Sequence, residues 1–142
     1  MPTSKASAVW EGGLRTGKGR YSAGSGAFSG AYSFTTRFEG AAGTNPEELI
    51  AAAHAACLSM ALSAGLERGG TPPTRVETAA QCTIEKVGEG FKITRMQLSV
   101  RGKVPGLSQE QFAAAAANAK EGCPVSGALK GNVEFVLDAV LD

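Results

Sequence analysis

The sequence predicts an α+β fold in a single domain of residues 1–142, with strands that pair mainly antiparallel. Three observations predict it. Short alternating segments separated by glycines occupy the first 40 residues, an Ala-rich apolar stretch extends from Pro46 to about Arg68, and two long alternating segments flank a turn at residues 88–90. Strands alternate in polarity with a period of two, whereas the long stretch is apolar nearly all round, as expected of a buried helix.

The first 40 residues are expected to form strands over residues 6–10, 19–22 and 32–38, with a flexible loop over 24–30. In the last of these strands Tyr32, Phe34, Thr36 and Phe38 lie at every second position. They would share one face, because side chains alternate between the two faces of a strand. Arg37 would then point away from this apolar face.

The segment GTNPEEL predicts the start of a helix. Asn45 is the expected N-cap, Pro46 fits the first helical position, and Glu48 falls at the capping-box position. Apart from Gly65, no breaker follows before residues 69–73, so the helix should be roughly 34 Å long. No apolar stretch is expected to be long enough to cross a membrane.

Residues 75–87 alternate as a half-buried strand, and the return strand begins at Phe91. The apolar residues of the return strand change parity after Ile93, which predicts a β-bulge around Thr94 and Arg95.

The remaining elements begin at recognisable helix signals. Ser108 and Gln111 have the spacing of a second capping box, which predicts a helix to about residue 121. Pro124 is expected to open a short helix to about residue 129, with Cys123 as its N-cap. The alternating tail from residue 133 predicts a closing strand.

Composition excludes several functional classes. The chain has 14 Lys and Arg against 13 Asp and Glu, a net charge of +1, and no basic run, which argues against nucleic-acid binding. The first ten residues lack the apolar core of a signal peptide. Three cysteines are too few for a secreted disulfide framework. We therefore expect a soluble cytoplasmic protein that binds neither nucleic acid nor membrane.

The hydrophobic residues are mostly small. They make up 43% of the chain, but 24 of them are alanine, so few large side chains remain to build a core. A thin core in a chain of this size suggests that a second copy supplies part of the burial. We expect a homodimer.

The cysteines differ in their local sequence. Cys82 shares a predicted strand face with Val76 and Ile84, which is typical of a small core residue. Cys57 lies in the middle of the long helix among alanines. Cys123 lies at a helix N-terminus, where unpaired N–H groups favour the thiolate.

Metal and hydrolase chemistry have weaker support. His54, Cys57, Cys82 and Cys123 could form a Cys3His zinc set, but no close cysteine pair is present to nucleate it, and His54 fits a hydrogen-bonded core histidine better. Ser126 lacks the context of a nucleophilic serine, and the chain has a single histidine. No cofactor or metal is expected.

The segment TRFEGAAGTNPEELIAAAHAACLSMAL and the later GCPVS, together with WEGGL and TGKG near the start, resemble the OsmC/Ohr family of thiol peroxidases, and its OsmC branch in particular. The resemblance covers essentially the whole chain. It implies antiparallel sheets wrapped around a long central helix in an intertwined homodimer. It also implies reduction of organic hydroperoxides, and of hydrogen peroxide less well, in oxidative or osmotic stress defence.

The resemblance also implies roles for four residues. Cys57 matches the peroxidatic cysteine, Cys123 the resolving cysteine, Arg37 the family's arginine, and Glu47 its partner. Arg37 would stabilise the Cys57 thiolate, because a free thiol is mostly protonated at neutral pH. The Cys57 sulfenic acid would condense with Cys123 to a disulfide, which a dithiol, by resemblance a dihydrolipoyl group, would reduce.

Two questions stay open. A redox-sensing or structural dimer with oxidisable thiols is the alternative to an enzyme. Glu47 and Cys57 lie ten residues apart on one predicted helix, about 15 Å along its axis. We therefore hypothesise that Glu47 and Arg37 of one chain complete the Cys57 and Cys123 site of its partner.

Overall fold

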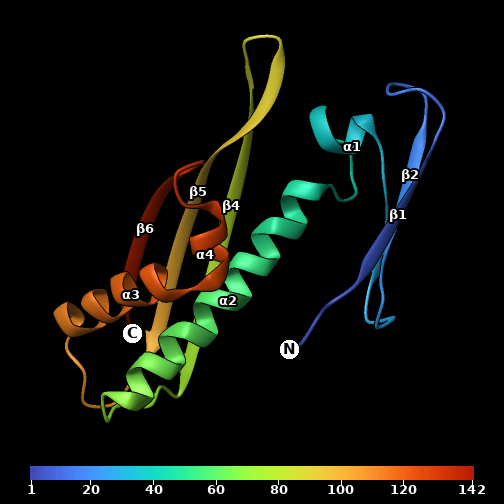
Figure 1. Ribbon diagram of the computed structural model, residues 1–142. Coiled ribbons are helices and arrows are strands. Elements are labelled where there is room, and N and C mark those ends of the chain that lie inside the picture. Colours follow the sequence, from blue (N-terminus) through green and yellow to red (C-terminus); the bar gives the residue numbers. More distant parts are fainter. The chain divides into compact units, whose positions relative to one another are not determined.

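Two three-stranded sheets, each in its own part of the chain, organise the fold (Figure 1). The computed structural model describes residues 1–142, which divide into one unit over Met1–Leu49 and a second over Ile50–Asp142. The expected α+β class is confirmed.

The first unit contains an antiparallel meander of β1 (Ala6–Glu11), β2 (Lys18–Ala23) and β3 (Ser29–Tyr32). The rings of Trp10, Tyr21 and Tyr32 form a row, with centroids 5.5 and 6.0 Å apart. Only Gly19 and Glu47 are buried in this unit, and Val9 keeps 63% of its surface exposed. The unit therefore has no hydrophobic core of its own.

The predicted strand over residues 32–38 is wrong. The strand ends at Tyr32, and residues Phe34–Phe38 form a one-turn helix, α1. Ser33 caps it: its hydroxyl accepts from the Thr36 N–H, and the Thr36 hydroxyl accepts from the Ser33 N–H. This reciprocal capping box outweighs the alternating pattern, because it satisfies two backbone donors locally. Phe34 and Phe38 then stack one turn apart, with ring centroids separated by 5.0 Å.

Helix α2 (Pro46–Arg68) has the predicted bounds. Asn45 accepts the Glu48 N–H at 2.8 Å, as expected of an N-cap. Glu48 does not complete the predicted capping box; its carboxylate accepts from the Thr44 hydroxyl at 2.7 Å instead. The helix is also long and apolar enough to cross a membrane by length and composition, contrary to the expectation from the sequence. The expectation failed because the charges of this helix all lie near its ends.

One stripe of α2 is buried, at His54, Leu58, Leu62 and Leu66. The opposite side, at residues 52, 56 and 60, is exposed, and Met60 keeps 75% of its surface accessible. An amphipathic surface helix would place polar residues there. The alanines at residues 52 and 56 are small enough to leave room for a second helix to approach closely.

The second sheet begins with the predicted hairpin of β4 (Arg75–Val87) and β5 (Gly90–Lys103). Thr83 pairs with Arg95 and Ile84 pairs with Ile93, so Thr94 is the extra residue of a bulge. The bulge confirms the interpretation of the parity change. Beyond it the pairing continues in register to Gly90 at the hairpin turn.

Helices α3 (Gln109–Gly122) and α4 (Pro124–Leu129) follow, and β6 (Glu134–Leu141) closes the chain. The Ser108 capping box and the Cys123 N-cap position are as predicted. The expectation of antiparallel sheets is wrong in one place, since β6 pairs parallel to β5. The two helices cross one face of the sheet between these strands, and such a crossover returns the chain in its original direction.

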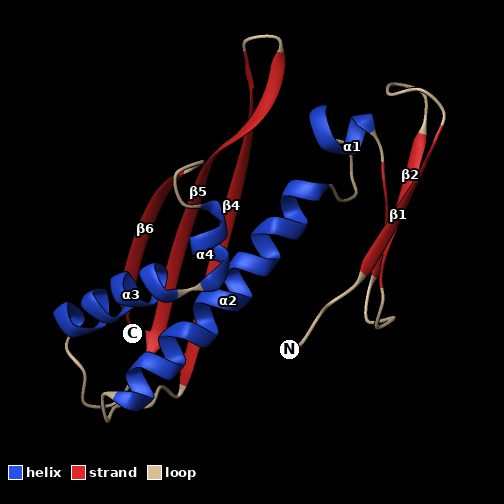
Figure 2. Ribbon diagram, in the orientation of Figure 1, coloured by secondary structure: helices blue, strands red, loops and turns tan.

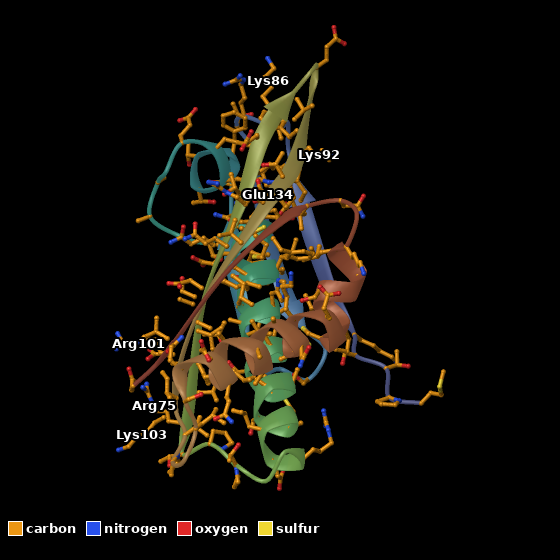
Figure 3. All side chains as sticks on the ribbon, turned by 90° about the vertical axis from the view of Figure 1, so that its left-hand side faces the viewer. Arg75, Lys86, Lys92, Arg101, Lys103 and Glu134 are labelled. Carbon is orange, nitrogen blue, oxygen red and sulfur yellow. The ribbon has the colours of Figure 1, made fainter.

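The core of the second unit lies between this sheet and its helices, which share one face of it (Figures 1 and 2). The outer face is polar. Figure 3 shows charged side chains near both ends of the hairpin, with Arg75, Arg101 and Lys103 at one end and Lys86 and Lys92 toward the turn. Partly buried Cys82 packs against the core from β4, which agrees with its predicted place on the apolar strand face.

A substitution at Gly102 tests how closely α3 packs on β5. A Cβ at this buried glycine would overlap the ring of Phe112, which is fully buried. We expect Gly102→Ala to destabilise the fold by about 1–3 kcal/mol, because the ring has no space to move into. Gly90→Ala, in the same strand with nothing within 4 Å, is the matched control and should cost less than about 1 kcal/mol. Urea unfolding of both variants measures the difference; equal stabilities would contradict this packing.

Candidate active site

Two sulfur atoms meet where α2 and α4 pack together in the second unit. The sulfur of Cys123 lies 2.8 Å from the sulfur of Cys57, within hydrogen-bond distance. Cys123 is buried, at 1% exposure, whereas Cys57 is partly exposed. Little movement would be needed to form a disulfide, whose S–S bond is about 2.05 Å long. Cys57 is the sulfur that a molecule from solvent reaches first.

The local sequence explains how each sulfur is placed. Cys57 precedes Leu58 of the buried α2 stripe, so its side chain lies at the border of the core. Cys123 is the single residue between α3 and α4, and Pro124 starts α4 directly after it. The packing of α3 through Phe112 and Ala116 therefore fixes the position of the second sulfur.

The two thiols differ in acidity. Burial raises the pKa of the Cys57 thiol, and its hydrogen bond with Cys123 raises it further, against a smaller opposite effect of the Val125 N–H. Burial also acts to raise the pKa of Cys123, but interactions with Cys57 and with the N–H and hydroxyl groups of Ser126 outweigh it. The pKa of Cys123 is lowered as a result. Within the second unit, the first negative charge of the pair is favoured on Cys123.

A buried polar pair lies next to the sulfurs. Nε2 of His54 is 2.7 Å from the hydroxyl of Ser126, and both residues are buried, at 0% and 4% exposure. Burial lowers the pKa of His54, so its imidazole is neutral at neutral pH. His54 is the hydrogen-bonded core histidine that the sequence predicts, whereas the sequence predicts no role for Ser126. The available signal was their spacing, three residues before Cys57 and three after Cys123.

The first unit holds an ion pair. Nε and Nη2 of Arg37 donate to the carboxylate of Glu47, with a shortest distance of 2.7 Å. The Glu47 side chain is 6% exposed and that of Arg37 is 35% exposed. A fork-type pair of this kind fixes the plane of the guanidinium. These bonds leave Nη1 of Arg37 available to another acceptor.

The structure thus brings the four predicted site residues together as two pairs, Cys57 with Cys123 and Arg37 with Glu47. No group of three or more His, Cys, Asp or Glu side chains is arranged to hold a metal ion. Cys82 is not part of the sulfur pair. The chemistry available to the paired thiols is two-electron oxidation to a disulfide.

Comparison with known proteins gives consistent similarities. Residues 39–138 match the family model described as OsmC-like protein. The chain is 48% identical to peroxiredoxin OsmC of Escherichia coli over 91% of each chain. It is 32% identical to the organic hydroperoxide resistance protein of Xanthomonas axonopodis pv. citri, over 69% of this chain and 68% of the other.

A solved structure shares the fold over the full length. It is described as the organic hydroperoxide resistance protein OsmC of Legionella pneumophila, with a TM-score of 0.78 and 26% identity, and the match covers 100% of this chain and 98% of the other.

The sulfur geometry predicts the product of mild oxidation. We expect diamide to join Cys57 to Cys123 within one chain and to leave Cys82 open to alkylation, because only the first two sulfurs are in contact. Peptide mass spectrometry after alkylation identifies the linked cysteines. Cys82→Ala is the control and should give the same disulfide. A disulfide that contains Cys82 would contradict the geometry.

Proposed function

The chain belongs to the OsmC family, and from this premise we propose that it is a thiol peroxidase that reduces organic hydroperoxides, and hydrogen peroxide less well. The observation that carries the proposal is the 2.8 Å contact between a partly exposed and a buried thiol. The names of its relatives, peroxiredoxin and organic hydroperoxide resistance protein, support the substrate class.

The first step is attack by Cys57 on the peroxide. The thiolate takes the outer oxygen, the O–O bond breaks, and the departing alkoxide takes up a proton to become an alcohol. Cys57 is left as a sulfenic acid. Its greater exposure makes it the peroxidatic residue, since a bulky hydroperoxide has no path to Cys123 at 1% exposure.

The second step closes the disulfide. The Cys123 thiolate attacks the Cys57 sulfenic acid, an S–S bond forms, and the hydroxide that leaves takes up a proton from solvent to become water. A dithiol, which we assign to the dihydrolipoyl class from the family resemblance, then reduces the disulfide and is itself oxidised. Neither step needs a metal or prosthetic group. Three free thiols fit a reducing compartment such as the cytoplasm, where the enzyme would act in oxidative or osmotic stress defence.

Arg37 would supply the positive charge that the second unit lacks beside Cys57. Burial raises the pKa of Cys57, so the thiolate needs a cation that the residues packed around it do not provide. We assign this role to Arg37, with Glu47 orienting the guanidinium through the fork-type pair. Glu47 and Cys57 are ten residues apart on α2, about 15 Å of helix rise. The arginine of a second chain is therefore the more suitable source.

A homodimer would also bury two apolar surfaces that the single chain leaves exposed. The first unit buries no large apolar side chain, and α2 exposes Met60 and its neighbouring alanines. A second copy packed against these surfaces would bury both. The alternative function, a redox sensor whose thiols oxidise without turnover, would use the same disulfide but would not need the Arg37 and Glu47 pair beside a substrate.

Cysteine variants test the proposed roles. With cumene hydroperoxide and a dithiol, we expect Cys57→Ser to lose turnover. We expect Cys123→Ser to consume one equivalent in forming the Cys57 sulfenic acid and a second in over-oxidising it to sulfinic acid, and then to stop. Cys82→Ala should keep nearly full turnover. Peroxide consumption and peptide mass spectrometry give the results. Sulfinic acid at Cys123 in the Cys57→Ser protein would reverse the roles, and one equivalent consumed by the wild type would indicate a sensor.

Mixed dimers test the shared site. Light scattering should first give twice the 14.5 kDa chain mass; a stably folded monomer would end the proposal. Cys57→Ser chains are then refolded with chains that carry both Arg37→Ala and Glu47→Gln, a pair of changes that leaves no buried carboxylate without its cation. Half of the dimers would be mixed, each with one intact site of two, so activity should recover to about a quarter of wild type. No recovery in mixed dimers confirmed by native mass spectrometry would place Arg37 and Cys57 of one chain in the same site.

A further inference from the structure

A buried chain of polar groups leads from α2 to the sulfur pair. Nε2 of His54 lies 2.7 Å from the hydroxyl of Ser126. Cys123, at the start of the same short helix as Ser126, contacts Cys57 at 2.8 Å. Ser126 is the third residue of α4, which starts directly after the Cys123 N-cap. Its hydroxyl and its N–H both act on the Cys123 thiol to lower its pKa. The steps of the peroxidase cycle described above use neither His54 nor Ser126.

The direction of these hydrogen bonds follows from the unpaired nitrogen of His54. Its Nδ1 is buried and has no hydrogen-bond partner. A proton on Nδ1 would leave a buried donor unsatisfied, which is rarer and more costly in proteins than an unsatisfied acceptor. The proton therefore belongs on Nε2, where it is donated to Ser126. The Ser126 hydroxyl is then free to donate its own proton to Cys123.

We propose that His54 and Ser126 are positioning residues for the resolving step, in which they hold a hydrogen-bond donor on Cys123 and keep its sulfur anionic. The proposal rests on the proposed function for its place in the cycle. In the resolving step the Cys123 thiolate attacks the Cys57 sulfenic acid, the S–S bond forms, and the hydroxide that leaves at partly exposed Cys57 takes up a proton from solvent to become water. His54 transfers no proton and stays neutral throughout.

The same donors would assist the reduction of the disulfide. A reductant thiolate attacks the more accessible sulfur, Cys57, and Cys123 departs as the leaving thiolate. A leaving thiol of lower pKa departs faster. One polar pair would therefore accelerate the formation and the opening of the same disulfide, without contact with the peroxide.

Other ionisable groups around Cys123 are engaged elsewhere. On α3, Lys120 lies 3.6 Å from Glu121, and Glu121 also pairs with Lys130 beyond α4. From β6, Phe135 contributes an uncharged ring against His54, with centroids 5.8 Å apart, and Glu134 is exposed. Cys57 and His54 are the titratable groups of α2 beside this sulfur. The variants described next leave the charges of α3, α4 and β6 unchanged.

The first test is independent of peroxide. In a Cys57→Ala/Cys82→Ala background, the ultraviolet absorbance of the thiolate reports the ionisation of Cys123 alone. We expect Ser126→Ala and His54→Leu each to raise its midpoint by about one pH unit, since each removes or misdirects a hydrogen bond to a charged group. His54→Gln retains a donor near the position of Nε2 and should restore most of the acidity. Midpoints that do not move in correctly folded variants would overturn the proposal.

The second test measures the two oxidative steps separately by stopped flow and quenched mass spectrometry in the otherwise unchanged chain. Ser126→Ala and His54→Leu should form the Cys57 sulfenic acid within about twofold of the wild-type rate and form the disulfide about tenfold more slowly. His54→Gln should approach wild type in both steps. A parallel loss in both steps would indicate a merely structural role and overturn the proposal. If the wild type consumes no hydroperoxide, the proposed function fails, and the thiolate titration still decides the role of His54 and Ser126.

Discussion

The contact between Cys57 and Cys123 is the constraint on which the rest of the second unit depends. Two sulfurs at 2.8 Å require α2 and α4 to be held to within a fraction of an ångström. α4 has only six residues and no core of its own, so its position derives from α3. α3 is in turn held by Phe112 against Gly102 of β5 and by the bonds of Gln109 to Ala139 and Leu141 of β6. The sheet of β4, β5 and β6 therefore fixes the position of Cys123 relative to Cys57.

The first unit is organised around an ion pair and not around an apolar core. Its sheet has no buried apolar layer, and its most buried side chain is the charged Glu47. A buried carboxylate is tolerated when it is paired and hydrogen-bonded, and Arg37 supplies three contacts to it. The strength of this pair makes the guanidinium rigid, although the unit around it is thin. Rigidity at this position suits a group that must meet a developing charge without rearrangement.

Much of the fold could be predicted from local signals. The bounds of α2, the bulge at Thr94 and the start of α4 at Pro124 each depend on residues close in sequence, and each was confirmed. The strand over residues 32–38 failed because Ser33 and Thr36 offered the backbone a local alternative that periodicity does not detect. The parallel direction of β6 was missed because it depends on the path of two helices rather than on any residue in the strand.

The candidate site was predictable in part. The residues Cys57, Cys123, Arg37 and Glu47 came from the resemblance to a family, and local sequence alone had supported only the helix N-terminal place of Cys123. The acidity of each thiol could not be predicted, since it depends on which sulfur is nearer to Ser126 and on how deeply each is buried. His54 and Ser126 are 72 residues apart in the chain, and only the fold shows that they are partners.

The parallel pairing of β6 with β5 also has a consequence for how the molecule is assembled. Met96 pairs with Phe135, and the helices that carry Cys123 lie wholly within the intervening chain. Contacts of such high sequence separation raise the contact order and slow folding, because the entropy of closing the loop is lost before the pairing compensates it. A nascent chain has released Cys57 and the whole β4 and β5 hairpin before the last strand can dock. The helices that place Cys123 are released only after that hairpin, so the thiol pair cannot form until most of the chain has left the ribosome.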